Sequence, residues 1–104
     1  MKVQERLINY VTVRTPSNEE SEMVPSSTCQ FDLARKLEKE MEELGLTEVV
    51  LDDKCYLYGK LPATEGKENI PVLGFIAHMD TVSDFCDHEI RPVITENYDG
   101  GELI

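Results

Sequence analysis

An apolar run at residues 70–77 constrains the fold of this chain more than any other feature. The run contains no charged side chain, and it is followed at once by His78 and, two residues further on, by Asp80. A continuous apolar run of this length predicts a strand that is covered on both faces, as in the interior of an α/β protein. We therefore expect an α/β fold in which His78 and Asp80 lie at the end of a buried strand.

The first part of the chain predicts a short helix followed by a loop. Four apolar side chains recur at helical spacing and share one face: Val3, Leu7, Tyr10 and Val11. The helix should end by Thr15, because the residue before a proline is pushed out of the helical region and Pro16 follows. Residues 16–27 are rich in Ser, Pro, Asn and Glu, which indicates an exposed loop.

A second, longer helix follows this loop. A hydroxyl side chain of residues 26–28 is expected to cap its start, and Gly45 suits the left-handed residue that often follows a helix end. The expected apolar stripe consists of Phe31, Ala34, Leu37, Met41 and Leu44. The opposite, solvated face carries Lys36, Glu38, Lys39, Glu40, Glu42 and Glu43.

The rest of the chain carries strand signals. Thr47–Leu51 and Cys55–Leu61 flank a short polar turn and predict a hairpin. Beyond the apolar run, Val93–Thr95 predicts a short strand and Asn97–Gly101 a turn. Together these elements predict two helices packed on a mixed β-sheet, some of whose strands are absent from the chain.

Charge and cysteine content exclude several classes of protein. The chain has 21 acidic and 10 basic residues and a net charge of −11, which repels nucleic acids and anionic membrane surfaces. No apolar run approaches the roughly 20 residues that cross a bilayer, and the first residues do not form a signal peptide. Cys29, Cys55 and Cys86 are odd in number and widely spaced, which argues against a disulfide framework. We expect a cytoplasmic protein that binds neither nucleic acid nor membranes.

His78 and Asp80 form the main candidate site. Side chains two residues apart in a strand share a face, so Asp80 can accept a hydrogen bond from one ring nitrogen of His78. The other nitrogen then keeps its lone pair, as in metal-binding histidines. The pair can equally serve as base and orienting acid beside a nucleophile, or be structural; no GxSxG motif or activated cysteine accompanies it. His88 lies in an irregular acidic stretch and is not expected to be a ligand.

The motifs around this pair resemble those of a known family. Gly74–Thr81 is similar to the first metal-binding motif of the M20 metallopeptidases, which are dinuclear zinc enzymes. Val24–Ser27, Glu42–Leu46, Leu61–Ala63 and Pro92–Gly101 are similar to segments of the tripeptide aminopeptidase branch of that family, peptidase T. The resemblance runs through essentially the whole chain.

The resemblance implies an activity and roles for two residues. His78 would be a ligand to one of two zinc ions, and Asp80 would be the catalytic-site aspartate that orients it. The intact protein would be a zinc aminopeptidase that acts on tripeptides, with residues 1–104 forming the N-terminal portion of its catalytic domain. The other metal ligands, the general base and the lid or dimerisation domain would follow Ile104. Val82–Asp84 departs from the family, which often has a proline before this aspartate.

This chain by itself is expected to be inactive and not to bind zinc stably, because a catalytic zinc site needs about three protein ligands and the motif supplies one. An interrupted sheet exposes an unpaired edge and apolar surface, which favours self-association. Two other functions remain open. One is another M20-type activity, a carboxypeptidase or an N-acyl amino acid deacylase. The other is a non-catalytic acidic binding module in which His78 and Asp80 are purely structural.

Overall fold

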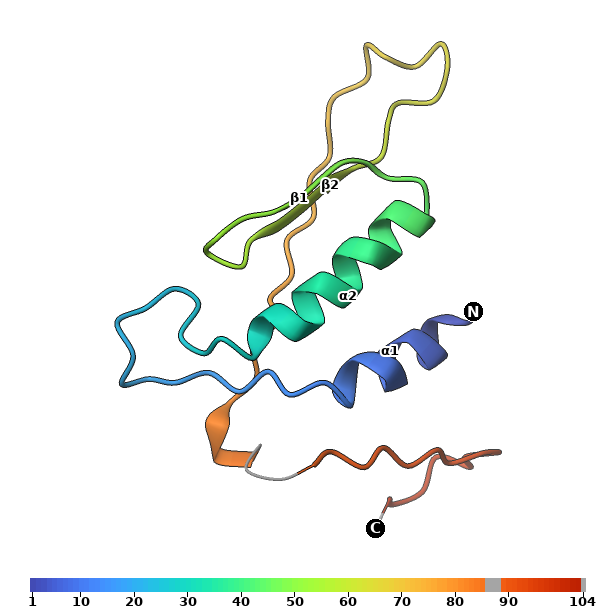
Figure 1. Ribbon diagram of the computed structural model, residues 1–104. Coiled ribbons are helices and arrows are strands. Elements are labelled where there is room, and N and C mark those ends of the chain that lie inside the picture. The colour runs from blue at the N-terminus through green and yellow to red at the C-terminus, as the bar shows by residue number, and fades with distance from the viewer. Residues whose placement is uncertain (86–88, 104) are drawn as a thin grey trace.

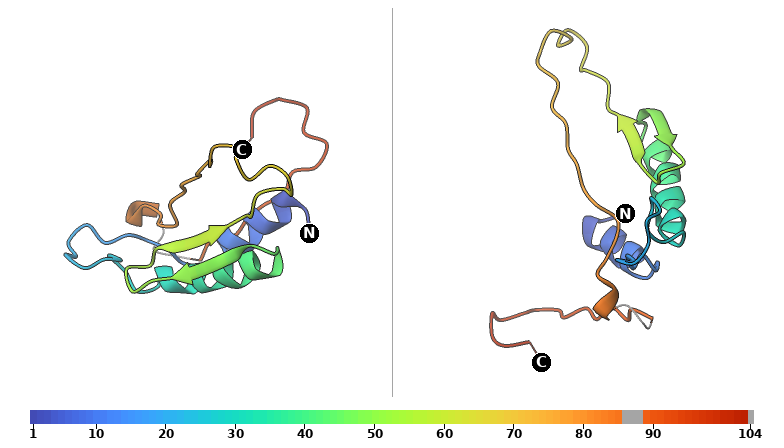
Figure 2. Two further views of the ribbon diagram at one scale, coloured as in Figure 1. Left: turned by 90° about the horizontal axis from the view of Figure 1, so that it is seen from above. Right: turned by 90° about the vertical axis from the view of Figure 1, so that its left-hand side faces the viewer.

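The computed structural model describes residues 1–85 and 89–103. The elements in chain order are α1 (Val3–Val11), α2 (Gln30–Glu43), β1 (Thr47–Leu51), β2 (Leu57–Lys60) and the single 3-10 turn η1 (Ser83–Phe85) (Figure 1). Helix α2 packs along one face of the β1–β2 hairpin, and α1 lies beside α2 (Figures 1 and 2). The predicted α/β class, with two helices beside a sheet, is confirmed.

The core lies between α2 and the hairpin. Leu33 and Ala34 of α2 are buried there, together with Cys55 from the hairpin turn. Gly59 of β2 permits the close approach of the helix end to the sheet. A Cβ atom at this position would lie 2.9 Å from Leu46 Cδ2 and 3.0 Å from Met41 Sδ, which is too close for an unadjusted side chain.

The C-terminal end of α2 forms as predicted. Gly45 adopts φ +88°, a conformation that glycine reaches without steric penalty. The Leu46 N–H donates to the Met41 carbonyl and the Gly45 N–H donates to the Glu42 carbonyl, both at 3.1 Å. These two bonds define a Schellman motif, which satisfies the last carbonyls of the helix and leads the chain into β1.

The start of α2 differs from the prediction. The N-cap residue is Cys29, and no side chain caps the helix. Backbone turns satisfy the first amides instead: the Gln30 N–H donates to the Ser27 carbonyl and the Phe31 N–H to the Thr28 carbonyl. The Ser26 hydroxyl accepts hydrogen bonds from the Asn18 N–H at 3.1 Å and from the side-chain amide of Gln30 at 3.5 Å, so it links the preceding loop to the first residue of the helix without capping it.

The two helices are joined through Glu40. This carboxylate forms an ion pair with Arg6 of α1 and accepts a hydrogen bond from the Tyr10 hydroxyl. The Glu40 side chain is only 18% exposed, so its predicted place on the solvated face of α2 is wrong. The pattern of α2 alone does not reveal that α1 covers this position.

The predicted hairpin is confirmed. Strands β1 and β2 pair antiparallel, with Val50 opposite Tyr58 and Leu51 opposite Leu57. Asp52 shapes the turn, because its Oδ1 accepts hydrogen bonds from the Lys54 N–H at 2.9 Å and the Tyr56 N–H at 2.8 Å. This aspartate turn, together with Cys55 in the left-handed conformation at φ +65°, reverses the chain without a glycine.

The apolar run forms no strand, and this part of the prediction is wrong. Its side chains are exposed, with Val72 at 98% and Ile76 at 102% of full exposure. A strand covered on both faces needs neighbouring strands for its backbone groups, and the described residues supply none along 70–77. Val93–Thr95 is likewise irregular and exposed. Within residues 1–85 and 89–103 the sheet is therefore the antiparallel β1–β2 pair rather than a mixed sheet.

Candidate functional site

His78 and Asp80 are brought together at the end of the exposed run. Nδ1 of His78 lies 3.1 Å from Oδ1 of Asp80 and 2.9 Å from the main-chain oxygen of Asp80. With the proton on Nδ1, the ring donates to these two oxygens and Nε2 keeps its lone pair. The side chain of His78 is 84% exposed. The contact expected from the spacing of two residues is thus present, although the backbone that carries it is irregular.

The next residue, Thr81, is bound to the chain segment that follows α1. The Thr81 N–H donates to the Thr15 carbonyl, and the Ser17 N–H donates to the Thr81 carbonyl, both at 2.8 Å. This pairing forms a short parallel bridge between Pro16 and Thr81. In Figure 1 the orange segment carrying Thr81 meets the blue segment between α1 and α2 at this bridge.

Side chains reinforce the bridge. The hydroxyls of Thr15 and Thr81 lie 3.3 Å apart, and the Ser17 hydroxyl donates to the Thr81 carbonyl at 3.0 Å. Thr15 is only 4% exposed. The sequence predicts an exposed loop over residues 16–27, and the polar composition of this segment gives no indication of these contacts.

The geometry fits a zinc ligand but not a complete zinc site. An imidazole whose second nitrogen is bound by a carboxylate is the usual arrangement of a metal-binding histidine. The described residues contain no group of three or more His, Cys, Asp or Glu side chains placed to hold a metal ion. Cys86 and His88 lie outside the described residues. What the structure assembles is one candidate ligand with its orienting carboxylate.

Cys55 is not suited to the role of nucleophile that a triad requires. Its side chain is buried, and this burial, together with the charge of Asp52, raises the pKa of its thiol. The thiolate is the reactive form, so a raised pKa lowers reactivity at neutral pH. The catalytic-triad interpretation of His78 and Asp80 therefore gains no support from this cysteine.

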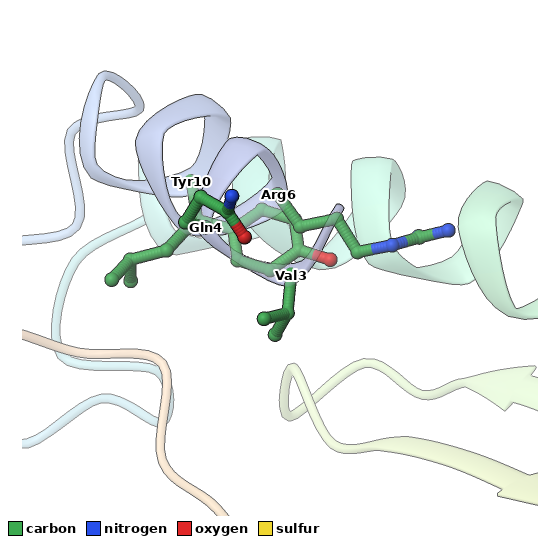
Figure 3. Close-up of a pocket in the computed structure, with 5 residues that line it drawn as sticks. Val3, Gln4, Arg6 and Tyr10 are labelled. Atoms are coloured by element: carbon green, nitrogen blue, oxygen red, sulfur yellow. The ribbon is translucent and has the colours of Figure 1, made fainter. Parts of the chain in front are cut away.

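A shallow hollow on α1 is separate from the histidine–aspartate pair. It is lined by Val3, Gln4, Arg6, Leu7 and Tyr10, which all belong to this helix (Figure 3). Val3 and Leu7 are 80% and 60% exposed. Three of the lining residues, Val3, Leu7 and Tyr10, belong to the apolar face that the sequence predicts for this helix, so the hollow is a solvent-exposed part of that face.

None of the helices in the described ranges has the length and apolar character that a membrane crossing requires.

Two comparisons with known proteins, one with family models and one with individual curated proteins, gave different results. No family model matches the chain. Proteins named peptidase T do match: that of Alkaliphilus oremlandii is 44% identical over 101 residues, and that of Caldanaerobacter subterraneus subsp. tengcongensis is 47% identical over 103 residues. These matches cover 96% and 99% of this chain. A Bacillus cereus protein of the same name is 44% identical over 99 residues.

Each match covers 24% or 25% of the relative, so the chain spans about a quarter of the length of the curated relatives it matches. Over nearly the whole length of this chain, 44–47% of the aligned residues are identical to those of a group of homologous proteins that share one name. That group is peptidase T, and the resemblance indicated by the motifs is confirmed.

Proposed function

We propose that this chain is the N-terminal portion, residues 1–104, of the catalytic domain of a zinc-dependent aminopeptidase that releases the N-terminal residue from tripeptides. The observation that carries the proposal is the contact between His78 Nδ1 and Asp80, which leaves Nε2 available as a metal ligand. It occurs in a chain that is similar to peptidase T along almost its whole length.

In this role Nε2 of His78 would hold one of two zinc ions, and Asp80 would act through the histidine. Its carboxylate holds the proton on Nδ1, fixes the orientation of the ring and raises the basicity of Nε2. Zinc held there would supply Lewis-acid polarisation of the scissile carbonyl and a bound water of lowered pKa. The remaining ligands and the general base come from the part of the protein that this chain does not include.

The proposed partner is a short peptide, and the proposed location is the cytoplasm. A net charge of −11 disfavours nucleic acids and anionic membranes as partners. Cys29 and Cys55 are both free thiols, which suits a reducing compartment.

The proposal predicts that this chain alone does not hydrolyse tripeptides, whereas a completed protein does. For the completed protein we suggest a chimera in which residues 1–104 replace the matching quarter of the Caldanaerobacter relative, to which they are 47% identical. Each protein is incubated with trialanine and zinc, and released alanine is measured. We expect release by the chimera and none above background by the chain alone.

Two results would contradict this proposal. Turnover by the chain alone would show that it contains a sufficient site. A zinc-loaded chimera that ignores trialanine but cleaves N-acyl amino acids or C-terminal residues would favour the other M20-type activities. The unmodified relative, assayed in parallel, controls for the competence of the remaining three quarters.

We further propose that the isolated chain self-associates through the exposed apolar run. Ile70, Val72, Leu73, Phe75 and Ile76 are each at least 61% exposed. Contiguous apolar surface of this kind favours association, and an extended, unpaired backbone can add to another chain. Sedimentation velocity should show dimers or larger species, and a Phe75→Asp, Ile76→Lys variant should be monomeric. Val3→Lys, at an exposed site on α1, is the matched control and should still associate; a monomeric parent chain would overturn the proposal.

A further inference from the structure

We propose that Thr15–Ser17, termed here the anchor segment, positions the metal ligand by holding the backbone immediately after Asp80. The inference rests on the proposed function of His78 and adds positioning residues to it. No sequence motif indicates them, because they lie in the polar loop that follows α1.

The peptide unit between Asp80 and Thr81 is the link between the anchor segment and the imidazole. Its N–H, from Thr81, donates to the Thr15 carbonyl at 2.8 Å. Its carbonyl oxygen, from Asp80, lies 2.9 Å from Nδ1 of His78. A peptide unit is planar and rigid, so fixing its N–H side fixes the direction of its carbonyl oxygen. The hydrogen bond of Thr15 therefore helps to set the orientation of the His78 ring.

The following peptide unit is held as well. The Thr81 carbonyl accepts hydrogen bonds from the Ser17 N–H at 2.8 Å and the Ser17 hydroxyl at 3.0 Å. Both sides of Thr81 are thus bound to the anchor segment. The dihedral angles of Thr81 cannot change without breaking at least one of these bonds, which protects the arrangement on its N-terminal side.

The anchor segment begins at a buried residue, whereas the chain just before His78 is exposed to solvent. Thr15 is 4% exposed, and its hydroxyl lies 3.3 Å from the Thr81 hydroxyl. Phe75 and Ile76, just before the histidine, are 90% and 102% exposed. The hydrogen bonds that restrain the backbone of the histidine–aspartate pair are therefore those of Thr81, on the C-terminal side of the pair.

The test compares side-chain variants in the chimera. Thr15→Val removes one hydroxyl while keeping the shape of the side chain, and Ser17→Ala removes the other. Ser21→Ala is the matched control, because its hydroxyl accepts the Met23 N–H in the same loop. Ser17→Thr keeps a hydroxyl and should restore the parent behaviour. Zinc affinity is measured by competition with a chromophoric chelator, and hydrogen exchange at the Thr81 amide is followed by mass spectrometry.

We expect the double variant Thr15→Val, Ser17→Ala to bind zinc about tenfold more weakly, at the lower end of the 10–100-fold typical of groups that orient metal ligands. Exchange at Thr81 should be about tenfold faster, since its hydrogen bond opens more often. Ser17→Ala alone, at a partly exposed site, should weaken zinc binding about threefold and keeps the test available if the double variant does not fold. Ser21→Ala should change neither quantity by more than about twofold.

The outcomes separate this inference from the proposed function. If His78→Ala leaves zinc binding intact, the proposed function fails, and the inference fails with it. If His78→Ala weakens zinc binding while the anchor variants retain parental zinc affinity, the role of the anchor segment is wrong and the proposed function stands. Faster exchange at Thr81 without any loss of zinc affinity would also overturn the inference, because it would assign the anchor segment a purely structural role.

Discussion

Replacing His78 by alanine in the chimera should lower tripeptide hydrolysis at least about 100-fold, because losing a direct ligand exceeds the roughly 10–100-fold effect of losing an orienting partner. His78 Nε2 is the metal-binding atom in the proposed site, and alanine offers no replacement. The zinc content of the purified chimera, measured by mass spectrometry, should fall together with activity. Added zinc should restore little of either.

Two companion variants make this result specific. His88→Ala removes the other histidine of the chain and should leave activity and zinc content near the parent values. Asp80→Asn keeps the shape of the side chain but removes its charge, and should produce the smaller loss, roughly 10–100-fold. Unchanged zinc content in His78→Ala would instead favour the non-catalytic module, in which His78 and Asp80 are only structural.

Replacing Leu33 by alanine should unfold most of the isolated chain. Leu33 is 7% exposed in a small core, and truncating a buried leucine costs about 2–5 kcal/mol of unfolding free energy. Native domains have about 5–15 kcal/mol of unfolding free energy, and the few buried apolar side chains of the described residues, Leu33, Ala34 and Cys55, place this chain at the low end of that range. Far-UV circular dichroism during urea unfolding measures the effect, with Phe75→Asp and Ile76→Lys included to keep the chain monomeric.

Leu44→Ala is the matched control for Leu33. Leu44 lies at the end of the same helix but is 58% exposed, so its truncation should cost less than about 1 kcal/mol. The comparison is informative because the helical pattern places Leu44 in the apolar stripe and omits Leu33. Equal losses in the two variants would contradict the packing of α2 described above.

The parts of the fold that follow from the sequence are those with local causes. Gly45 ends α2 because a left-handed residue is needed there, and the hairpin forms because a polar turn separates two short apolar segments. Contacts between distant residues leave no such pattern. Glu40 bonds to Tyr10 across 30 positions and Thr15 to Thr81 across 66, and neither contact was predicted.

The candidate site also combines a local contact that the sequence predicts with a dependence on distant segments that it does not predict. The contact between His78 and Asp80 could be predicted from their spacing, because the partners are only two positions apart and a single residue separates them. The buried strand that should carry them could not form from this chain. Its apolar composition shows a need for cover on both faces, but the composition does not show whether the covering strands are present. The apolar sequence of a segment therefore indicates that it needs to be covered, and only the fold shows whether other strands cover it.

The pairing of Thr15 with Thr81 has a consequence for the order of folding. It closes a loop between two positions that are 66 apart in sequence. This loop contains α2 and both strands, which depend on contacts close in sequence. During synthesis these elements emerge before Thr81 does, and local contacts form faster than distant ones. Their prior folding shortens the flexible chain that must be closed, which lowers the entropy cost of bringing the two threonines together. The backbone of the histidine–aspartate pair is thus ordered late, by docking onto a helix-bounded segment that is already in place.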